Sequence, residues 1–263
     1  MVKKHFWWVL CVLMLLSFTA ISWRPAADND ATIGVKKGPP TAKEAFEEYV
    51  NTVYQTANLQ QAGLDATVFQ KALTGFFNLK SANKLSQNSR VITVVDFNRS
   101  SCEKRMWIID VLSKHLLLNT WVAHGEGSGD DMATSFSDLD DSHQSSLGFY
   151  ITDNVYNGKH GKSLRLNGMD EGFNGTARAR DIVIHAAKYV GAGTIASLGR
   201  LGHSFGCPAV APQVRDKVIA ATKGGTMLFI NGNDSSYTSK YLDETNLPNF
   251  ATAETPQFQA ASR

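Results

Sequence analysis

Two stretches near the start of the chain place their apolar residues with the period of an α-helix. The positions that share one face are Phe46, Tyr49, Val50, Val53 and Tyr54 in the first, and Phe69, Ala72, Leu73, Phe76 and Phe77 in the second. Thr41 and Glu44 have the spacing of a capping box, and Asp65 can cap the second helix. Two helices of this length do not make a stable domain alone. We therefore expect residues 41–85 to pack on the segment that follows.

From residue 90 the pattern changes to short apolar and β-branched runs, which predict strands. The runs are 91–97, 106–112, 115–123, 147–152, 182–185 and 227–231. Ser113-Lys114 fits the turn of a hairpin, and Asn157-Gly158 is a strong turn signal. Gly- and Ser-rich connections lie at 124–146 and 191–206. The pattern predicts a mainly β body over residues 90–235 with two helices in front, and a frayed polar tail over 236–263.

The N-terminal segment has the features of an export signal. Lys3 and Lys4 precede an uncharged, largely apolar run over residues 6–23, and Ala20-Ile21-Ser22 would permit cleavage after Ser22. An uncleaved anchor is the alternative, because the run is near the minimum length of a membrane span. Such an anchor would tether the protein to the membrane. Either way residues 1–22 predict an exported body, and the polar residues 23–40 read as a linker.

Composition excludes some classes of protein without choosing a function. The chain has 263 residues, of which 43% are hydrophobic, so one substantial core is expected. A formal charge of +2 gives no broad electrostatic case for nucleic-acid binding. Three cysteines are too few for a disulfide-built scaffold, and removal of the signal would leave only Cys102 and Cys207.

Cys207 is the first candidate for chemistry. It lies between Gly206 and a proline, where a thiol can be exposed and where the glycine lets backbone amides turn toward an oxyanion. A nucleophilic thiol needs a base. His185, at the end of a predicted strand, is the best candidate, and His203, four residues before the cysteine, is the alternative. Cys207 could equally be a small buried apolar residue.

Other patterns permit weaker interpretations. His124, Glu126, His185 and His203 could bind zinc in an exported hydrolase, but they lack a tight spacing such as His-Glu-x-x-His. The glycines of 125–129 lack the Lys-Ser/Thr pair and the following helix of a phosphate-binding loop.

Two arginines and the second cysteine leave further alternatives open. Arg178 and Arg180 could hold a carboxylate or lie on a solvated face. Cys102, in a polar segment, is either an exposed loop thiol or a partner that could pair with Cys207 under oxidising conditions.

Several longer motifs, taken in order, resemble the murein L,D-transpeptidase family with a YkuD-type catalytic domain. They are 122–129 (VAHGEGSG), 133–137 (ATSFS), 145–150 (SSLGFY), 158–161 (GKHG), 172–174 (GFN), 182–185 (IVIH) and 199–209 (GRLGHSFGCPA). The resemblance runs from about residue 40 to 231. It implies a β-sandwich or barrel catalytic domain with the two N-terminal helices packed on it, α+β overall, in the cell envelope or periplasm of a bacterium.

The resemblance also implies site residues. A Ser/Thr-x-Gly-Cys motif with a cysteine nucleophile is matched by Ser204, Gly206 and Cys207, and the family's upstream catalytic histidine falls on His185. Many relatives carry His directly before the Gly-Cys pair, where this chain has Phe205. His203 stands where close relatives often carry Arg. The residues expected to line the substrate groove are His124, Gly125, Tyr150, His160, Gly161 and His203.

The activity implied is acyl transfer between peptidoglycan stem peptides. The thiolate attacks the carbonyl between residues three and four of a stem tetrapeptide, D-Ala leaves, and a diamino-acid amine resolves the thioester into a 3-3 cross-link. Water as acceptor would make the protein an L,D-carboxypeptidase. No metal or organic cofactor is required. A non-catalytic murein-binding module remains an alternative, although it would not need Cys207 and His185.

Overall fold

The two N-terminal helices begin at the caps that the sequence indicates. The computed structural model describes residues 40–86 and 88–246. Helix α2 (Ala42–Thr56) starts at Thr41, which forms both bonds of the capping box with Glu44. Helix α3 (Ala66–Ser81) starts at Asp65, whose carboxylate accepts from two backbone N–H groups of the first turn. The structure confirms both helices and both caps.

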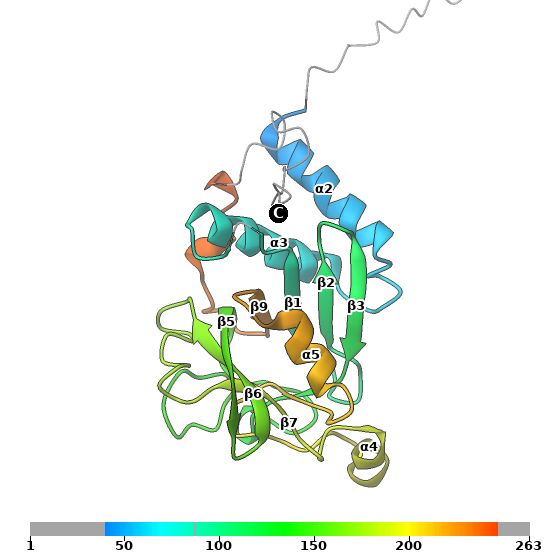
Figure 1. The fold of residues 1–263 in the computed structure, drawn as a ribbon, viewed down its shortest axis with the longest axis vertical. Helices are drawn as coiled ribbons and strands as arrows, with labels where there is room; N and C mark the ends of the chain where they lie inside the picture. The colour runs from blue at the N-terminus through cyan, green and yellow to red at the C-terminus, as the bar shows by residue number, and fades with distance from the viewer. Residues whose placement is uncertain (1–39, 87, 247–263) are drawn as a thin grey trace, which may run out of the picture. The chain divides into compact units, whose positions relative to one another are not determined.

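A nine-stranded sheet forms the rest of the framework, in the order β3-β2-β1-β9-β5-β6-β7-β8-β4 (Figure 1). The strands are β1 (Val91–Asp96), β2 (Met106–Asp110), β3 (His115–Thr120), β4 (Val122–Ala123), β5 (Gly148–Gly158), β6 (Gly161–Gly168), β7 (Val183–Ala186), β8 (Ala209–Val210) and β9 (Met227–Asn231). β3 and β4, at the two ends of this order, are separated in the chain by Trp121 alone. The sheet is therefore nearly closed, which confirms a mainly β, barrel-like fold.

One face of the sheet is covered by α3, and α2 contacts α3 in turn (Figure 1). Apolar side chains of both helices share one buried cluster with β1 and β9, including Phe69 and Phe76 of α3 and Phe229 of β9. A side chain at Gly75 of α3 would overlap the ring of Phe149, so this glycine permits the close approach of helix and sheet. The expectation that the helices pack on the following segment is confirmed.

The other face of the sheet encloses a second buried cluster, to which helix α5 (Arg215–Thr222) contributes Val218 and Ile219. Neither α5 nor α4 (Ala192–Leu198) is predicted by the sequence pattern. Helix α4 buries none of its residues, and α5 buries only Val218, Ile219 and Thr222, so their apolar periodicity is weak. The segment 191–206 is thus not a plain connection.

The C-terminal part of the body extends further than expected. Residues 240–246 form the short turns η2 (Lys240–Leu242) and η3 (Glu244–Asn246), and Tyr241 is buried against α3. The side-chain amide of Asn78 donates to the carbonyls of Tyr241 and Asp243, at 2.8 Å each. A frayed tail from residue 236 is therefore wrong for residues 236–246. Residues 247–263, and the expected signal and linker at 1–22 and 23–39, lie outside the described residues.

The β5–β6 hairpin differs from its prediction in position and length. Gly158 pairs with Gly161, so the two-residue loop is Lys159-His160 rather than Asn157-Gly158, and β5 runs six residues beyond the expected end at Thr152. The turn comes two residues later because Asn157 and Gly158 remain in the ladder.

Across 40–86 and 88–246, no helix is long and apolar enough to cross a membrane.

Candidate active site

Strands β7 and β8 bring together the two distant motifs that carry His185 and Cys207. They run parallel, and His185 pairs with Ala209, two residues after Cys207. The Cys207 Sγ accepts from the Val183 N–H at 3.4 Å and donates to the Asp181 carbonyl at 3.7 Å. The thiol is therefore held against the start of β7, the strand that carries His185.

The turn before Cys207 is fixed by Ser204 and Gly206. The Ser204 hydroxyl donates to the Cys207 carbonyl at 2.7 Å and accepts from the Gly206 N–H at 3.1 Å. Gly206 has φ 111°, and a Cβ there would lie 2.7 Å from the Gln144 carbonyl oxygen, so only glycine fits. Because Ser204 occupies the Gly206 amide, that amide is not a free oxyanion donor. Among the described residues, no hydrogen bond uses the Cys207 N–H, which leaves it available.

His185 is held with one ring nitrogen bonded and the other open. Its side chain is 2% exposed, and Nδ1 lies 3.0 Å from the Ala186 carbonyl oxygen. A carbonyl only accepts, so Nδ1 carries the proton and Nε2 keeps its lone pair. Burial lowers the pKa of His185, and the nearby His160 and Lys159 lower it further, against the opposing hydrogen bond to Ala186. The imidazole is therefore neutral at neutral pH and can accept a proton.

The thiol is held in its protonated form. Burial raises the pKa of Cys207, while the Val183 N–H, Arg180 and Lys159 oppose that rise. With the thiol pKa raised and the imidazole pKa lowered, the resting pair is uncharged. Proton transfer to His185 would then accompany nucleophilic attack rather than precede it.

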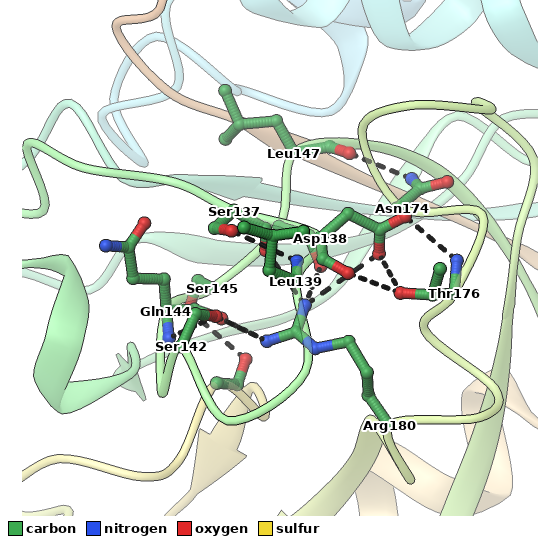
Figure 2. Close-up of polar contacts among 12 residues, drawn as sticks. Ser137, Asp138, Leu139, Ser142, Gln144, Ser145, Leu147, Asn174, Thr176 and Arg180 are labelled. Carbon is green, nitrogen blue, oxygen red and sulfur yellow. Dashed lines mark hydrogen bonds and ion pairs between the residues drawn. The ribbon is translucent and has the colours of Figure 1, made fainter.

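Arg180 lies at the centre of a network of polar contacts with the segment 137–144 (Figure 2). Its guanidinium donates to the carbonyls of Ser137 and Gln144, at 2.8 Å each, and lies 3.8 Å from the Asp138 carboxylate. The two charged side chains are 4% and 9% exposed. Asp138 also accepts from the Thr176 N–H at 2.9 Å. Since the Gln144 carbonyl faces Gly206, this buried network fixes the wall on which the turn rests.

The structure thus resolves the two readings of the arginine pair. Arg180 holds a carboxylate, that of Asp138 in its own chain, whereas Arg178 forms a surface pair with Asp153 at 3.2 Å. Sequence reasoning missed Asp138 and also Asp181, which has φ 53° and turns its carbonyl toward the thiol. No spacing or motif in the sequence indicates either role.

Two of the residues expected to line the substrate groove lie in the interior. His124 and Tyr150 are both 0% exposed. His124 accepts from Arg105 at Nδ1 (2.7 Å) and donates from Nε2 to the Gly129 carbonyl (3.2 Å), and the Tyr150 hydroxyl donates to the Ser146 carbonyl at 2.8 Å. The prediction that His124 and Tyr150 contact substrate is wrong, because both side chains are enclosed by the fold.

Gly125 is also buried, and its role is to let two backbone segments meet. A Cβ there would lie 2.8 Å from the Gly206 nitrogen and 2.3 Å from the His143 carbonyl oxygen. Gly125 also forms a parallel bridge with Ser204, which ties the segment after β4 to the cysteine turn. It therefore supports the turn instead of lining a groove.

The remaining groove candidates are accessible. His203 is half-buried, and its Nε2 donates to the Asp130 carbonyl at 2.7 Å, so this nitrogen is not open to act as base for Cys207. His160 and Gly161 are exposed at the tip of the β5–β6 hairpin. The His160 ring stacks on that of His185 with centroids 4.2 Å apart. Whether any of the three contacts substrate stays a prediction.

Phe205, the departure from the family motif, is 61% exposed beside the cysteine turn. Its ring stacks on His143 with centroids 4.1 Å apart, and His143 Nδ1 lies 2.7 Å from a Glu126 oxygen. The position where the resemblance leads us to expect a histidine is thus occupied by an aromatic ring that faces solvent.

The zinc hypothesis lacks a set of ligands. Both nitrogens of His124 are bonded, Glu126 pairs with His143, and His185 stacks on His160. Within the part of the chain that the structure describes, no three His, Cys, Asp or Glu side chains form a group that could hold a metal ion. Cys102 and Cys207 are both free thiols, and Cys102 Sγ donates to the Gly199 carbonyl at 3.1 Å.

Comparison with protein families identifies the class. The family model of the L,D-transpeptidase catalytic domain matches residues 60–231, which is more than half of the chain. The chain therefore belongs to the L,D-transpeptidase catalytic domain family. The match begins after α2, so that helix lies outside it. A search of curated proteins found no match.

Similar solved structures include three bacterial L,D-transpeptidases. The protein from Mycobacterium smegmatis is 11% identical over 55% of this chain and 59% of its own (TM-score 0.34). That from Xylanimonas cellulosilytica is 12% identical over 54% and 60% (TM-score 0.32), and that from Stackebrandtia nassauensis is 13% identical over 72% and 78% (TM-score 0.34). The chain spans less than two thirds of the first two. These scores are too low to support a conclusion, and family membership rests on the sequence match.

Proposed function

We propose that this protein is a peptidoglycan L,D-transpeptidase in which Cys207 is the nucleophile and His185 the general base. The observation that carries the proposal is the pairing of β7 with β8, which sets a thiol beside the strand of an imidazole whose Nε2 is unprotonated. The family match to the L,D-transpeptidase catalytic domain supports the same chemistry. The apolar N-terminal run supports export to the bacterial cell envelope.

In the first half-reaction, Sγ of Cys207 attacks the carbonyl carbon between residues three and four of a stem tetrapeptide. Nε2 of His185 takes the thiol proton, and the Cys207 N–H donates to the developing oxyanion. When the tetrahedral intermediate collapses, the C–N bond breaks and the imidazolium gives its proton to the departing amine of D-Ala. The product is a thioester between Cys207 and residue three.

In the second half-reaction, the side-chain amine of a diamino acid in a neighbouring stem attacks the thioester. His185 takes a proton from this amine, the C–S bond breaks, and the proton returns to the sulfur. The new amide joins two residues at position three, which is a 3-3 cross-link. If water attacks instead, the products are a stem tripeptide and free enzyme, and the protein is an L,D-carboxypeptidase.

The test is intact-mass spectrometry of the purified body with a defined disaccharide tetrapeptide, combined with analysis of the products. Cys207→Ala is compared with Cys102→Ala, which removes the other free thiol described in the structure. We expect an acyl adduct on wild type and on Cys102→Ala, none on Cys207→Ala, and cross-linked dimer as product.

Other outcomes assign the protein differently. An adduct followed only by tripeptide establishes the carboxypeptidase. Turnover that survives Cys207→Ala and is abolished by a chelator establishes metal-dependent hydrolysis. Binding to murein without adduct or product, from a folded protein with reduced thiols, establishes a binding module and overturns the proposal.

A further inference from the structure

The tip of the β5–β6 hairpin reaches the proposed catalytic base. Its two loop residues are Lys159 and His160, and the His160 ring lies on the His185 ring at a centroid distance of 4.2 Å and an interplanar angle of 23°. His160 is itself exposed, while His185 is almost completely buried. The exposed imidazole therefore covers the buried one on the side of the hairpin.

The hairpin holds this position through contacts of the residues at the start of β6. Gly161, directly after His160, has φ 72°, which lets the chain turn sharply into β6. Lys162 Nζ lies 3.2 Å from the Asp216 carboxylate of α5, and the Ser163 hydroxyl donates to the Gly161 carbonyl at 3.0 Å. The loop is thus fixed on the β6 side, and His160 is directed at β7 by the conformation of the turn.

The stack supplies a constraint that the hydrogen bond of His185 lacks. The bond from Nδ1 to the Ala186 carbonyl fixes the tautomer and one edge of the ring, but the ring can still tilt about that edge. A second ring packed parallel to it opposes the tilt. Since Nε2 has to point at the Cys207 proton within a narrow angle, restricting the tilt favours proton transfer.

We propose that His160 is a positioning residue, which acts through its ring stack on His185 to hold Nε2 in the orientation needed for proton transfer from Cys207. The inference rests on the proposed function and extends it, because it gives the hairpin tip a task other than contact with the substrate.

The charged and titratable groups around this pair come from three elements. The hairpin contributes Lys159 and His160, the turn before β8 contributes Cys207, and the segment before β7 places Arg180 and Asp181 near the thiol. Lys159 lowers the pKa of both His185 and Cys207. The positive charge of Lys159 therefore disfavours the protonated form of His185 and favours the thiolate form of Cys207. In the imidazolium–thiolate pair that forms during attack, these two effects oppose each other.

The experiment compares His160→Ala, which removes the stack, with His160→Phe, which keeps an aromatic ring without titratable nitrogens. At saturating donor tetrapeptide we expect His160→Ala to slow acylation of Cys207 about tenfold and His160→Phe to restore the rate to within about threefold of wild type. The KM for the donor should stay unchanged in both. A change in KM at constant acylation rate, equal losses in the two variants, or no loss in His160→Ala would overturn the proposal.

A second readout is independent of catalysis and separates this proposal from the proposed function. The titration of His185 is followed by NMR from its Cε1–H resonance in the same three proteins. We expect the pKa of His185 to rise in His160→Ala, which exposes the ring, and to rise less in His160→Phe, which keeps it covered. Identical titrations in all three would show that the stack does not form, even if wild type is acylated. Absence of acylation with shifted titrations would instead overturn the proposed function alone.

Discussion

Two regions of this protein each hold a pair of neighbouring histidines, yet only one of them suits catalysis. In the first, which we call the His124 region, the rings of His124 and His203 lie 5.0 Å apart. In the second, the His185 region, His185 stacks on His160, and the strand that carries His185 holds the Cys207 thiol at the Val183 N–H. His124 and His185 are almost equally buried, at 0% and 2% exposure. Burial therefore does not distinguish the structural imidazole from the candidate base.

Hydrogen bonding makes the difference. Both nitrogens of His124 are occupied, one by the Arg105 guanidinium and one by the Gly129 carbonyl. Protonation would set a second positive charge against Arg105 in the interior, and burial together with that charge lowers the pKa of His124 to about 4. His185 uses only Nδ1 and leaves Nε2 open. A buried histidine becomes a base when one nitrogen is fixed and the other is left free.

The largest effect is expected from His185→Gln, which removes the proposed base while its side-chain amide can still donate to the Ala186 carbonyl. The rate of Cys207 acylation should fall by about 100-fold to 10,000-fold, because proton transfer loses its acceptor. The thermal midpoint should change little. Acylation is followed by intact mass, and a rate within threefold of wild type would remove the distinction between the two regions.

The next largest effect is expected from the buried Arg180 network, which supports the cysteine turn of the His185 region. Arg180→Met leaves the buried Asp138 carboxylate without its cation and frees the Ser137 and Gln144 carbonyls, so unfolding should become easier by about 3–5 kcal/mol. Arg178→Met removes an exposed pair with Asp153 and should cost no more than about 1 kcal/mol. Chemical denaturation measures both. Equal losses would show that the network in Figure 2 is not a buried support.

The His124 region makes stability depend on pH. The folded pKa of His124, about 4, lies below its ordinary value of 6.5, so on acidification the unfolded chain takes up a proton before the folded one does. The folding free energy that depends on a neutral His124 is fully present above about pH 6.5. It is lost as pH falls toward 4, by on the order of 3 kcal/mol. Denaturant unfolding at several pH values measures the slope.

The matched variant is His124→Gln. It should be less stable than wild type at pH 7 by about 1–3 kcal/mol, because a flexible amide does not hold the Arg105 guanidinium and the Gly129 carbonyl in the positions set by the rigid imidazole. The gap should narrow on acidification, since the variant has no imidazole to protonate. A constant gap from pH 7 to about pH 4.5 would contradict the low pKa of His124.

The sequence alone could predict the helix caps and the two candidate catalytic residues. Thr41 and Asp65 cap their helices as predicted because capping depends on residues three or fewer positions apart. Cys207 and His185 could be named from two motifs, and the parallel pairing of β7 and β8 adds that these two motifs are neighbours in the fold.

What local sequence could not show is which motif residues face inward. The Gly-rich sequence around His124 is also typical of a loop that contacts substrate. The His124 side chain is instead held in the interior by Arg105, which lies outside the motif. Asp138 and Asp181 act through long-range contacts of the chain, with Arg180 and with the thiol, and no periodicity encodes them. The folded segment after residue 236 likewise depends on Asn78 of a distant helix.

The smallest effect lies outside both regions. Thr41→Ala removes the cap of α2 and should lower the free energy of unfolding by about 1 kcal/mol without changing acylation. The measurement pairs denaturant unfolding with the acylation rate. A reduced acylation rate in this variant at full folding would indicate that α2 influences the site.

The most direct test of the account is the pH dependence of Cys207 acylation in wild type and His124→Gln, over the range in which both stay folded. The account predicts one acidic limb below about pH 6.5, set by His185, followed by a plateau, with superimposable curves for the two proteins. A rate that keeps rising toward the pKa of the thiol, or a limb that moves when His124 is replaced, would contradict the assignment of His185 as the base.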